Sequence, residues 1–109
     1  MFQRLGKNTE FKKVYNFGRW KSNRDLVMVV LKCDSSAQIY GFSVSKKVGN
    51  SVVRHRITRQ LREIANKNVN NIKVGYKIVV IAKPEVAGKK FDEINKSFLH
   101  LCRLQGIMR

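Results

Sequence analysis

Acidic residues are scarce in this chain of 109 residues. Seven Asp and Glu residues stand against 23 Lys and Arg residues, which gives a formal net charge of +16. Self-repulsion of that size destabilises a compact state, and an anionic partner relieves it. The imbalance therefore predicts that the chain binds a polyanion, and it leaves few carboxylates for acid–base chemistry.

Cysteine, proline and long apolar runs are also few or missing. The two cysteines, Cys33 and Cys102, are too few for a disulfide scaffold, and we expect both to be small core residues in a reducing compartment. No apolar run approaches the ~18 residues of a membrane span, and the first residues show no apolar signal segment. With one proline, Pro84, and no linker-like stretch, residues 1–109 are predicted to form a single domain.

The apolar pattern predicts three helices and four strands. We expect helices at about 8–17, at 51–66 and from about 89 onward. Asn8 or Thr9 is the expected N-cap of the first helix, which ends at Gly18, and Ser51 is the expected N-cap of the second. Strands are expected at 26–31, 39–45 and 76–82, and a weaker one at 19–21. The order α-β-β-β-α-β-α indicates an α+β fold, a two-layer α/β sandwich with helices packed on a small mixed sheet. A short turn between the first two long strands predicts an antiparallel hairpin, and helix 51–66 is a candidate crossover to a parallel strand.

The segment 46–62 is the strongest functional signal. Its six basic residues have no acid among them, and none occurs anywhere in 35–62. On a helix at ~100° per residue, the apolar positions form one stripe, most of the basic positions occupy the opposite half, and Arg54 flanks the stripe. An ordinary solvated face normally mixes charges of both signs, whereas a run of arginines three residues apart suits phosphates. Nucleic acid is therefore the leading class of ligand.

Three aromatic residues near the N-terminus are open to two interpretations. Phe11, Tyr15 and Trp20 are either core residues or a surface on which single-stranded bases stack, with Lys12 and Lys13 following the phosphates. The histidines, His55 and His100, have no partners at metal-ligand or triad spacing, so we predict no catalytic residue and no metal site in the protein.

The sequence of segment 46–62 resembles the motif of a known family. It reads Lys-Lys-Val-Gly-Asn-Ser-Val-Val-Arg-His-Arg-Ile-Thr-Arg-Gln-Leu-Arg, and the bacterial ribonuclease P protein component carries Lys-Lys-x-Gly-Asn-x-Val-x-Arg-Asn-Arg-x-Lys-Arg. Residues 4–15, 42–45 and 78–84 also match that family's pattern, so the resemblance covers essentially the whole chain. Three positions depart from it: His55 replaces Asn, Thr58 replaces Lys, and Gln60 stands where relatives often have a basic residue.

The resemblance implies a function that composition alone does not reach. A member of this family joins the catalytic ribonuclease P RNA, which holds Mg²⁺ and performs the endonucleolytic hydrolysis that removes the 5′ leader of precursor tRNA. The protein binds that RNA and the leader, contributes no catalytic residue, and works in the bacterial cytoplasm away from membranes. The implied fold is that of the second domain of ribosomal protein S5, with a left-handed crossover.

Carried over residue by residue, the resemblance implies two sites. The surface that meets the catalytic RNA comprises Lys46, Lys47, Asn50, Arg54, His55, Arg56, Arg59 and Arg62, and the cleft that receives the leader comprises Phe11, Lys12, Tyr15, Ser43 and Ser45.

Three rival functions remain open on the residues themselves. A plain RNA-binding or ribosomal protein shares the basic helix but does not stimulate leader cleavage. A self-sufficient nuclease needs a carboxylate cluster for metal ions, and the acids here are scattered. A membrane-surface helix needs a broader apolar face than this narrow aliphatic stripe.

Overall fold

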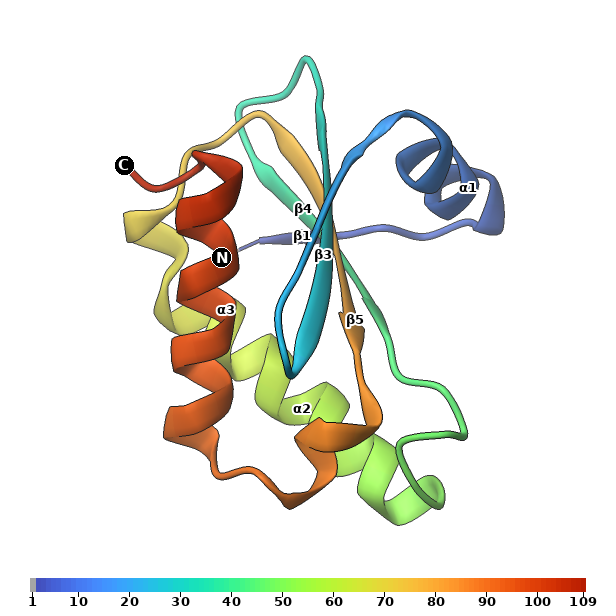
Figure 1. Cartoon of the computed structure of the whole chain (residues 1–109). Helices are drawn as coiled ribbons and strands as arrows, with labels where there is room; N and C mark the ends of the chain where they lie inside the picture. Colours follow the sequence, from blue (N-terminus) through green and yellow to red (C-terminus); the bar gives the residue numbers. More distant parts are fainter. Residues whose placement is uncertain (1) are drawn as a thin grey trace.

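One mixed sheet with helices on both faces makes up residues 2–109, the part of the chain that the computed structural model describes (Figure 1). The elements run in the order β1 (Gln3–Arg4), α1 (Asn8–Phe17), β2 (Arg19–Ser22), β3 (Leu26–Lys32), β4 (Gln38–Ser43), α2 (Ser51–Lys67), the 3-10 turn η1 (Val69–Asn71), β5 (Tyr76–Ala82), the 3-10 turn η2 (Pro84–Gly88) and α3 (Phe91–Gln105). The predicted α+β class and element order are confirmed. Strand β1 was not predicted, because two exposed residues carry no periodicity.

The strand order is β1-β4-β5-β3-β2. Strand β5 is parallel to β4, so the predicted crossover through α2 is confirmed. The predicted β3–β4 hairpin is wrong, because β5 lies between them and pairs antiparallel with β3. Both β3 and β5 are apolar on both faces, and that composition suits interior positions with a neighbour on each side. The turn at 34–36 reverses the chain without making its two strands neighbours.

The two faces of the sheet are covered unequally. Helices α2 and α3 together cover one face, where Met28, Tyr40 and Ile78 belong to the larger core cluster. Helix α1 alone lies on the other face, where Val14 packs with Val29 and Val79 (Figure 1). A single short helix cannot cover a five-stranded sheet, so part of this second face stays open.

Helix α1 begins differently from the prediction. Its N-cap is Lys7, which makes no side-chain cap, rather than Asn8 or Thr9. The Glu10 carboxylate accepts a hydrogen bond from the Gly6 N–H (3.0 Å), which lowers the pKa of Glu10. Gly18 ends the helix as predicted, in an extended conformation, and a Cβ there would lie 2.5 Å from the Val14 carbonyl oxygen.

Buried polar and sulfur groups fix α3 against the sheet. The Gln105 amide, which is 2% exposed, donates to the carbonyls of Arg19 (2.8 Å) and Met28 (3.0 Å), so it joins α3 to β2 and β3. Both cysteines are free. Cys102 is buried, and burial raises the pKa of its thiol to about 12, so it acts as the predicted core residue, while Cys33 is half-buried.

In the described part of the chain no helix has the length and apolarity to cross a membrane.

Candidate nucleic-acid interface

The start of α2 is fixed by a side-chain cap. The Asn50 Oδ1 atom accepts a hydrogen bond from the Val53 N–H (3.0 Å), so the N-cap is Asn50 and the predicted Ser51 is wrong. Val48 is buried and anchors the preceding loop, while Lys46 and Lys47 in the same turn are exposed. The first turn of α2 contains no acidic residue. The positive end of the helix dipole and two lysines are therefore close in sequence and open to an anion.

The side chains of the arginines and the histidine of α2 point in three directions. His55 and Arg59 are exposed and lie opposite the buried stripe of Ile57, Leu61 and Ile64. Arg56 turns toward η2, where its guanidinium donates to the Ala87 carbonyl (2.9 Å). The predicted apolar stripe is confirmed, while the arginines form a band around the helix rather than one flat face.

Arg54 and Arg62 form the third direction, together with Thr58 between them. These residues are one helical turn apart in succession and half-buried, and the Thr58 hydroxyl donates to the Arg54 carbonyl (2.9 Å). The Nε atoms of both arginines are buried without a hydrogen-bond partner. Their stems therefore lie against the protein, which holds the guanidinium groups along the flank of α2 that faces β4.

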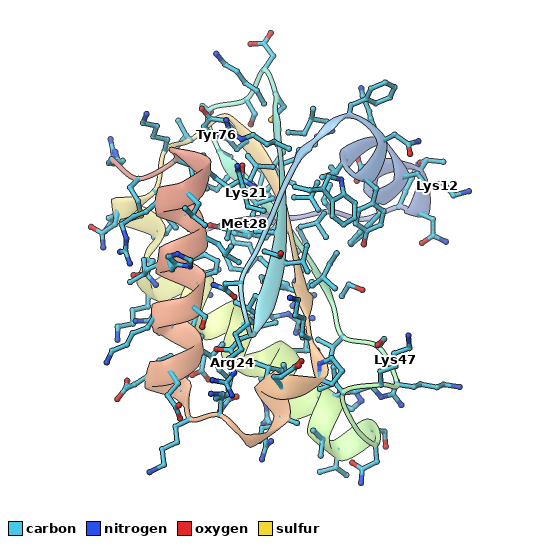
Figure 2. The ribbon with its side chains drawn as sticks, viewed as in Figure 1. Lys12, Lys21, Arg24, Met28, Lys47 and Tyr76 are labelled. Carbon is cyan, nitrogen blue, oxygen red and sulfur yellow. The ribbon has the colours of Figure 1, made fainter. Side chains whose placement is uncertain are left out.

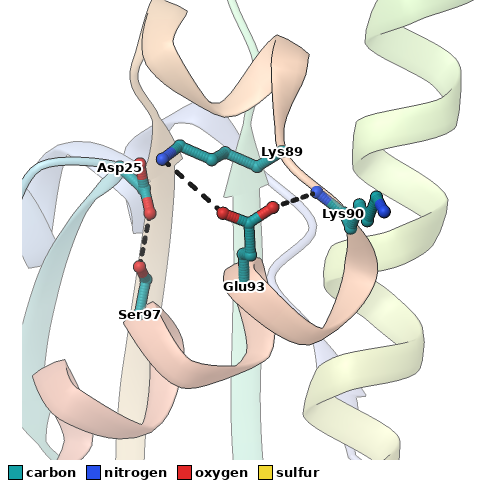
Figure 3. A network of polar contacts seen from close by, with 5 residues as sticks. All are labelled: Asp25, Lys89, Lys90, Glu93 and Ser97. Atoms are coloured by element: carbon teal, nitrogen blue, oxygen red, sulfur yellow. Dashed lines mark hydrogen bonds and ion pairs between the residues drawn. The ribbon is translucent and has the colours of Figure 1, made fainter.

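Carboxylates do not neutralise this band. Within residues 2–109 there is one ion pair, between Lys89 Nζ and Glu93 Oε2 at 3.8 Å, at the start of α3 (Figure 3). Glu93 also accepts from the Lys90 N–H there, and the Asp25 carboxylate accepts from the Ser97 hydroxyl (2.5 Å). These acids stabilise the α3 side of the fold. The α2 arginines thus keep their charge for a partner outside the chain.

Most of the residues predicted for the leader cleft lie on the open face of the sheet, between α1 and the loop before α2. The floor of the cleft is a row of half-buried residues in register across three strands, Val27 on β3, Ile81 on β5 and Ser43 on β4. Ser45 lies beyond the end of β4, which stops two residues earlier than predicted, and its carbonyl accepts from the Val48 N–H (3.1 Å). Of the two predicted serines, Ser43 therefore belongs to the floor and Ser45 to the turn.

Aromatic side chains form the α1 wall of the cleft. The Phe11 and Tyr15 rings are 6.3 Å apart, and Tyr15 and Trp20 are 5.6 Å apart. Trp20 is 50% exposed, and its indole N–H donates to the Tyr15 carbonyl (3.0 Å). Lys12 points away from the sheet, on the same side of the molecule as Lys47 (Figure 2). The three aromatics form a continuous series with polar edges, which suits stacked bases.

A small hollow joins this wall to α2. It has a volume of about 160 Å³ and brings Phe11 of α1 together with Arg62 and Thr58 of α2 and with Arg4 of β1. A second hollow of about 200 Å³ lies between Val44 and the Arg54 side of α2. Arg4 was not predicted as a site residue, although it begins the matched segment 4–15; only the pairing of β1 with β4 places it here.

Comparison with known proteins gives one family. A family model described as Ribonuclease P matches residues 1–104. The ribonuclease P protein component of Lachnoclostridium phytofermentans is 42% identical over 108 residues, which are 99% of this chain and 93% of that protein. That of Clostridium kluyveri is also 42% identical, over 97% of this chain and 96% of its own.

Solved structures agree with the fold. The RNase P protein of Staphylococcus aureus superposes with a TM-score of 0.88 at 28% identity, and the match covers 100% of both chains. The RNase P protein of Thermotoga maritima gives a TM-score of 0.85 at 25% identity, over 92% of this chain and 94% of the other.

The cap of α2 gives a stability prediction. Asn50→Ala removes the acceptor of the Val53 N–H and should lower the free energy of unfolding by about 1 kcal/mol. Ser51→Ala, one residue later, should change it far less. Urea denaturation followed by circular dichroism measures both, and a larger loss for Ser51→Ala would contradict the assignment of the cap.

Proposed function

The chain belongs to the ribonuclease P protein family, and from that premise we propose that it is the RNA-binding subunit that helps a catalytic RNA remove the 5′ leader of precursor tRNA. Membership gives it a role in the ribonuclease P holoenzyme, a ribonucleoprotein of tRNA processing, with ribonuclease P RNA as its partner. Binding of the leader, catalysis by the RNA and a place in the bacterial cytoplasm are part of the proposal.

One observation carries this function: the arginine band and the aromatic wall meet at a common hollow. Arg62 comes from α2 and Phe11 from α1, and Arg4 lies beside both. Two RNA surfaces can therefore be held next to each other, one by phosphate contacts along α2 and one by stacking along α1. A plain RNA-binding domain has no need for such a junction.

The two surfaces differ in the form of RNA that they suit. The α2 band of exposed and half-buried arginines presents a row of positive charges, as required for the phosphates of a folded RNA. The cleft presents ring faces above a floor of Val27, Ile81 and Ser43, where an unpaired strand can lay its bases. We therefore assign the catalytic RNA to α2 and the single-stranded leader to the cleft.

Magnesium ions belong to the RNA in this proposal. Residues 2–109 contain no group of three or more His, Cys, Asp or Glu side chains placed to hold a metal ion, so the donor set of the protein does not fit one. The contribution of the protein is charge: a formal +16 reduces the repulsion between the leader-bearing substrate and the catalytic RNA. Less Mg²⁺ is then needed for the two RNAs to associate.

Cleavage of a 5′-labelled precursor tRNA at low Mg²⁺ tests the proposal directly. The reactions contain a bacterial ribonuclease P RNA with the protein, that RNA alone, and the protein alone. We expect leader release to rise only when both are present. Cleavage by the protein alone would indicate a protein nuclease, and RNA binding without stimulation would indicate a plain RNA-binding protein.

Arg59 is the cleanest probe of the α2 surface, because it is exposed and has no carboxylate partner in the described residues. Arg59→Ala should weaken assembly with the catalytic RNA and reduce the slope of log K against log salt by about 1. Arg103→Ala removes an exposed charge from the last turn of α3, outside the α2 surface, and is the control. Equal slopes for Arg59→Ala and the unaltered protein would contradict the assignment.

Phe11 probes the cleft. In the holoenzyme, Phe11→Ala should weaken the binding of precursor tRNA about tenfold through lost stacking, and leave mature tRNA unchanged because it lacks a leader. Since Phe11 also packs on Gly41, thermal unfolding of the variant is measured alongside. Tyr15→Leu, which keeps apolar bulk, serves as a second variant with the same expected direction. Equal losses for both tRNAs in a folded variant would count against the cleft.

A further inference from the structure

Helix α1 has two flanks, and the proposed cleft uses only one of them. At ~100° per residue, Phe11 and Tyr15 lie about 60° and 100° to one side of the buried Val14, and Phe17 and Lys13 lie about 60° and 100° to the other. The helix packs over the strand row Val29, Val79 and Gly41. The rows on both sides of it remain for other contacts.

The second flank opens onto its own groove. The row there is Leu31 on β3, Lys77 on β5 and Ile39 on β4, in register across the three strands. With Lys13 and Phe17 of α1 and Lys32 of β3, these residues line a hollow of about 410 Å³, which we call the distal groove. An adjoining hollow of about 380 Å³ shares Phe17, Leu31 and Lys32 and extends to Arg19 and Tyr76.

Phe17 stands between these two hollows with 73% of its surface exposed. It is more exposed than Trp20, which is 50% exposed, and helix α1 ends at Phe17, so no later turn of the helix covers the ring. A single exposed ring is ordinary on a protein surface, but this one stands at the edge of two hollows and offers a flat apolar face to a ligand there.

The charges around Phe17 identify the partner. Lys13, Lys32 and Lys77 line the distal groove with one acid, Asp34. Arg19, beside the adjoining hollow, donates its guanidinium N–H to Gln105 of α3 instead. Three lysines around an open ring complement a ligand that has both flat apolar faces and regularly spaced negative charge. Single-stranded RNA has both, whereas a protein partner would have to bring clustered carboxylates next to an aromatic pocket.

We propose that the distal groove binds single-stranded RNA, with a base stacked on Phe17 and phosphates held by Lys13 and Lys32. The proposal rests on the proposed function only for the source of the strand, which we take to be the part of the 5′ leader upstream of the segment in the cleft. Helix α1 then has bound nucleotides on both of its flanks, and long leaders contact both.

Photocrosslinking of the free, full-length chain tests binding in the groove. The probe is a short oligouridylate that contains 5-iodouridine, and the crosslinked peptide is identified by mass spectrometry. We expect crosslinks at Phe17 as well as in the cleft, and Phe17→Ala should weaken oligouridylate binding about fivefold to tenfold. Leu104→Ala removes a 47% exposed side chain from α3, on the opposite face of the sheet, and should have no effect. Crosslinks confined to Phe11 and Tyr15, with equal affinities for the two variants, would overturn the proposal.

A series of leader lengths identifies the source of the strand. In the holoenzyme, Phe17→Ala should reduce affinity for precursor tRNAs with long leaders and leave those with short leaders unchanged, whereas Phe11→Ala should affect both. If Phe17→Ala weakens oligouridylate binding but its effect in the holoenzyme does not depend on leader length, the groove binds RNA and the leader is not the source of the strand.

Sedimentation tests whether a second copy of the chain occupies the groove instead. A dimer that disappears in Phe17→Ala, with RNA binding intact, would show that a second copy occupies the groove and would overturn the RNA assignment. Failure of wild-type protein to stimulate cleavage would reject the proposed function without bearing on the crosslinks.

Discussion

The contact between the Phe11 ring and the backbone of Gly41 determines the geometry of the open face. A Cβ at position 41 would lie 2.5 Å and 2.6 Å from two atoms of that ring, so only glycine lets α1 approach the sheet so closely. With Phe11 seated there, Val14 is driven onto Val29 and Val79 and is completely buried. The helix is thereby held across one row of the sheet. Everything else on this face, the cleft on one side and the distal groove on the other, follows from that position.

The charge distribution imposes a second constraint. The fold uses its few acids where they stabilise structure: Glu10 accepts from the Gly6 N–H before α1, Glu93 stabilises the start of α3, and Asp25 holds Ser97. None of these lies against the arginines of α2 within ion-pair distance. Stability must therefore come from the apolar core shared by the sheet, α2 and α3, while the unneutralised charge costs free energy that binding to a polyanion would recover.

Periodicity in the sequence predicts much of this structure and also shows where prediction stops. Strand β5 matches its expected range, and Ile57, Leu61 and Ile64 are buried as the helical pattern requires. These predictions hold because the spacing of apolar residues along the sequence determines which of them share one face of a helix or strand. The β3–β4 hairpin failed because sheet neighbours depend on long-range pairing, which a turn between two strands does not determine. Both predicted caps failed by one or two residues, since Lys7 and Asn50 compete with equally plausible neighbours and the choice is made by loop geometry.

The candidate site shows the same division between local pattern and tertiary placement. The residues of the α2 band are recognisable in the sequence because segment 46–62 is rich in basic residues and contains no acid. The directions in which the arginines point, however, come from contacts with η2 on one flank of the helix and with β4 on the other. Arg4 reaches the hollow beside Phe11 only because a two-residue strand pairs with β4. Phe17 carries no signal of its own, because a phenylalanine at the end of an amphipathic helix is ordinarily a core residue. Its place about 60° from the buried Val14, on the flank away from Phe11, leaves the ring exposed beside the distal groove.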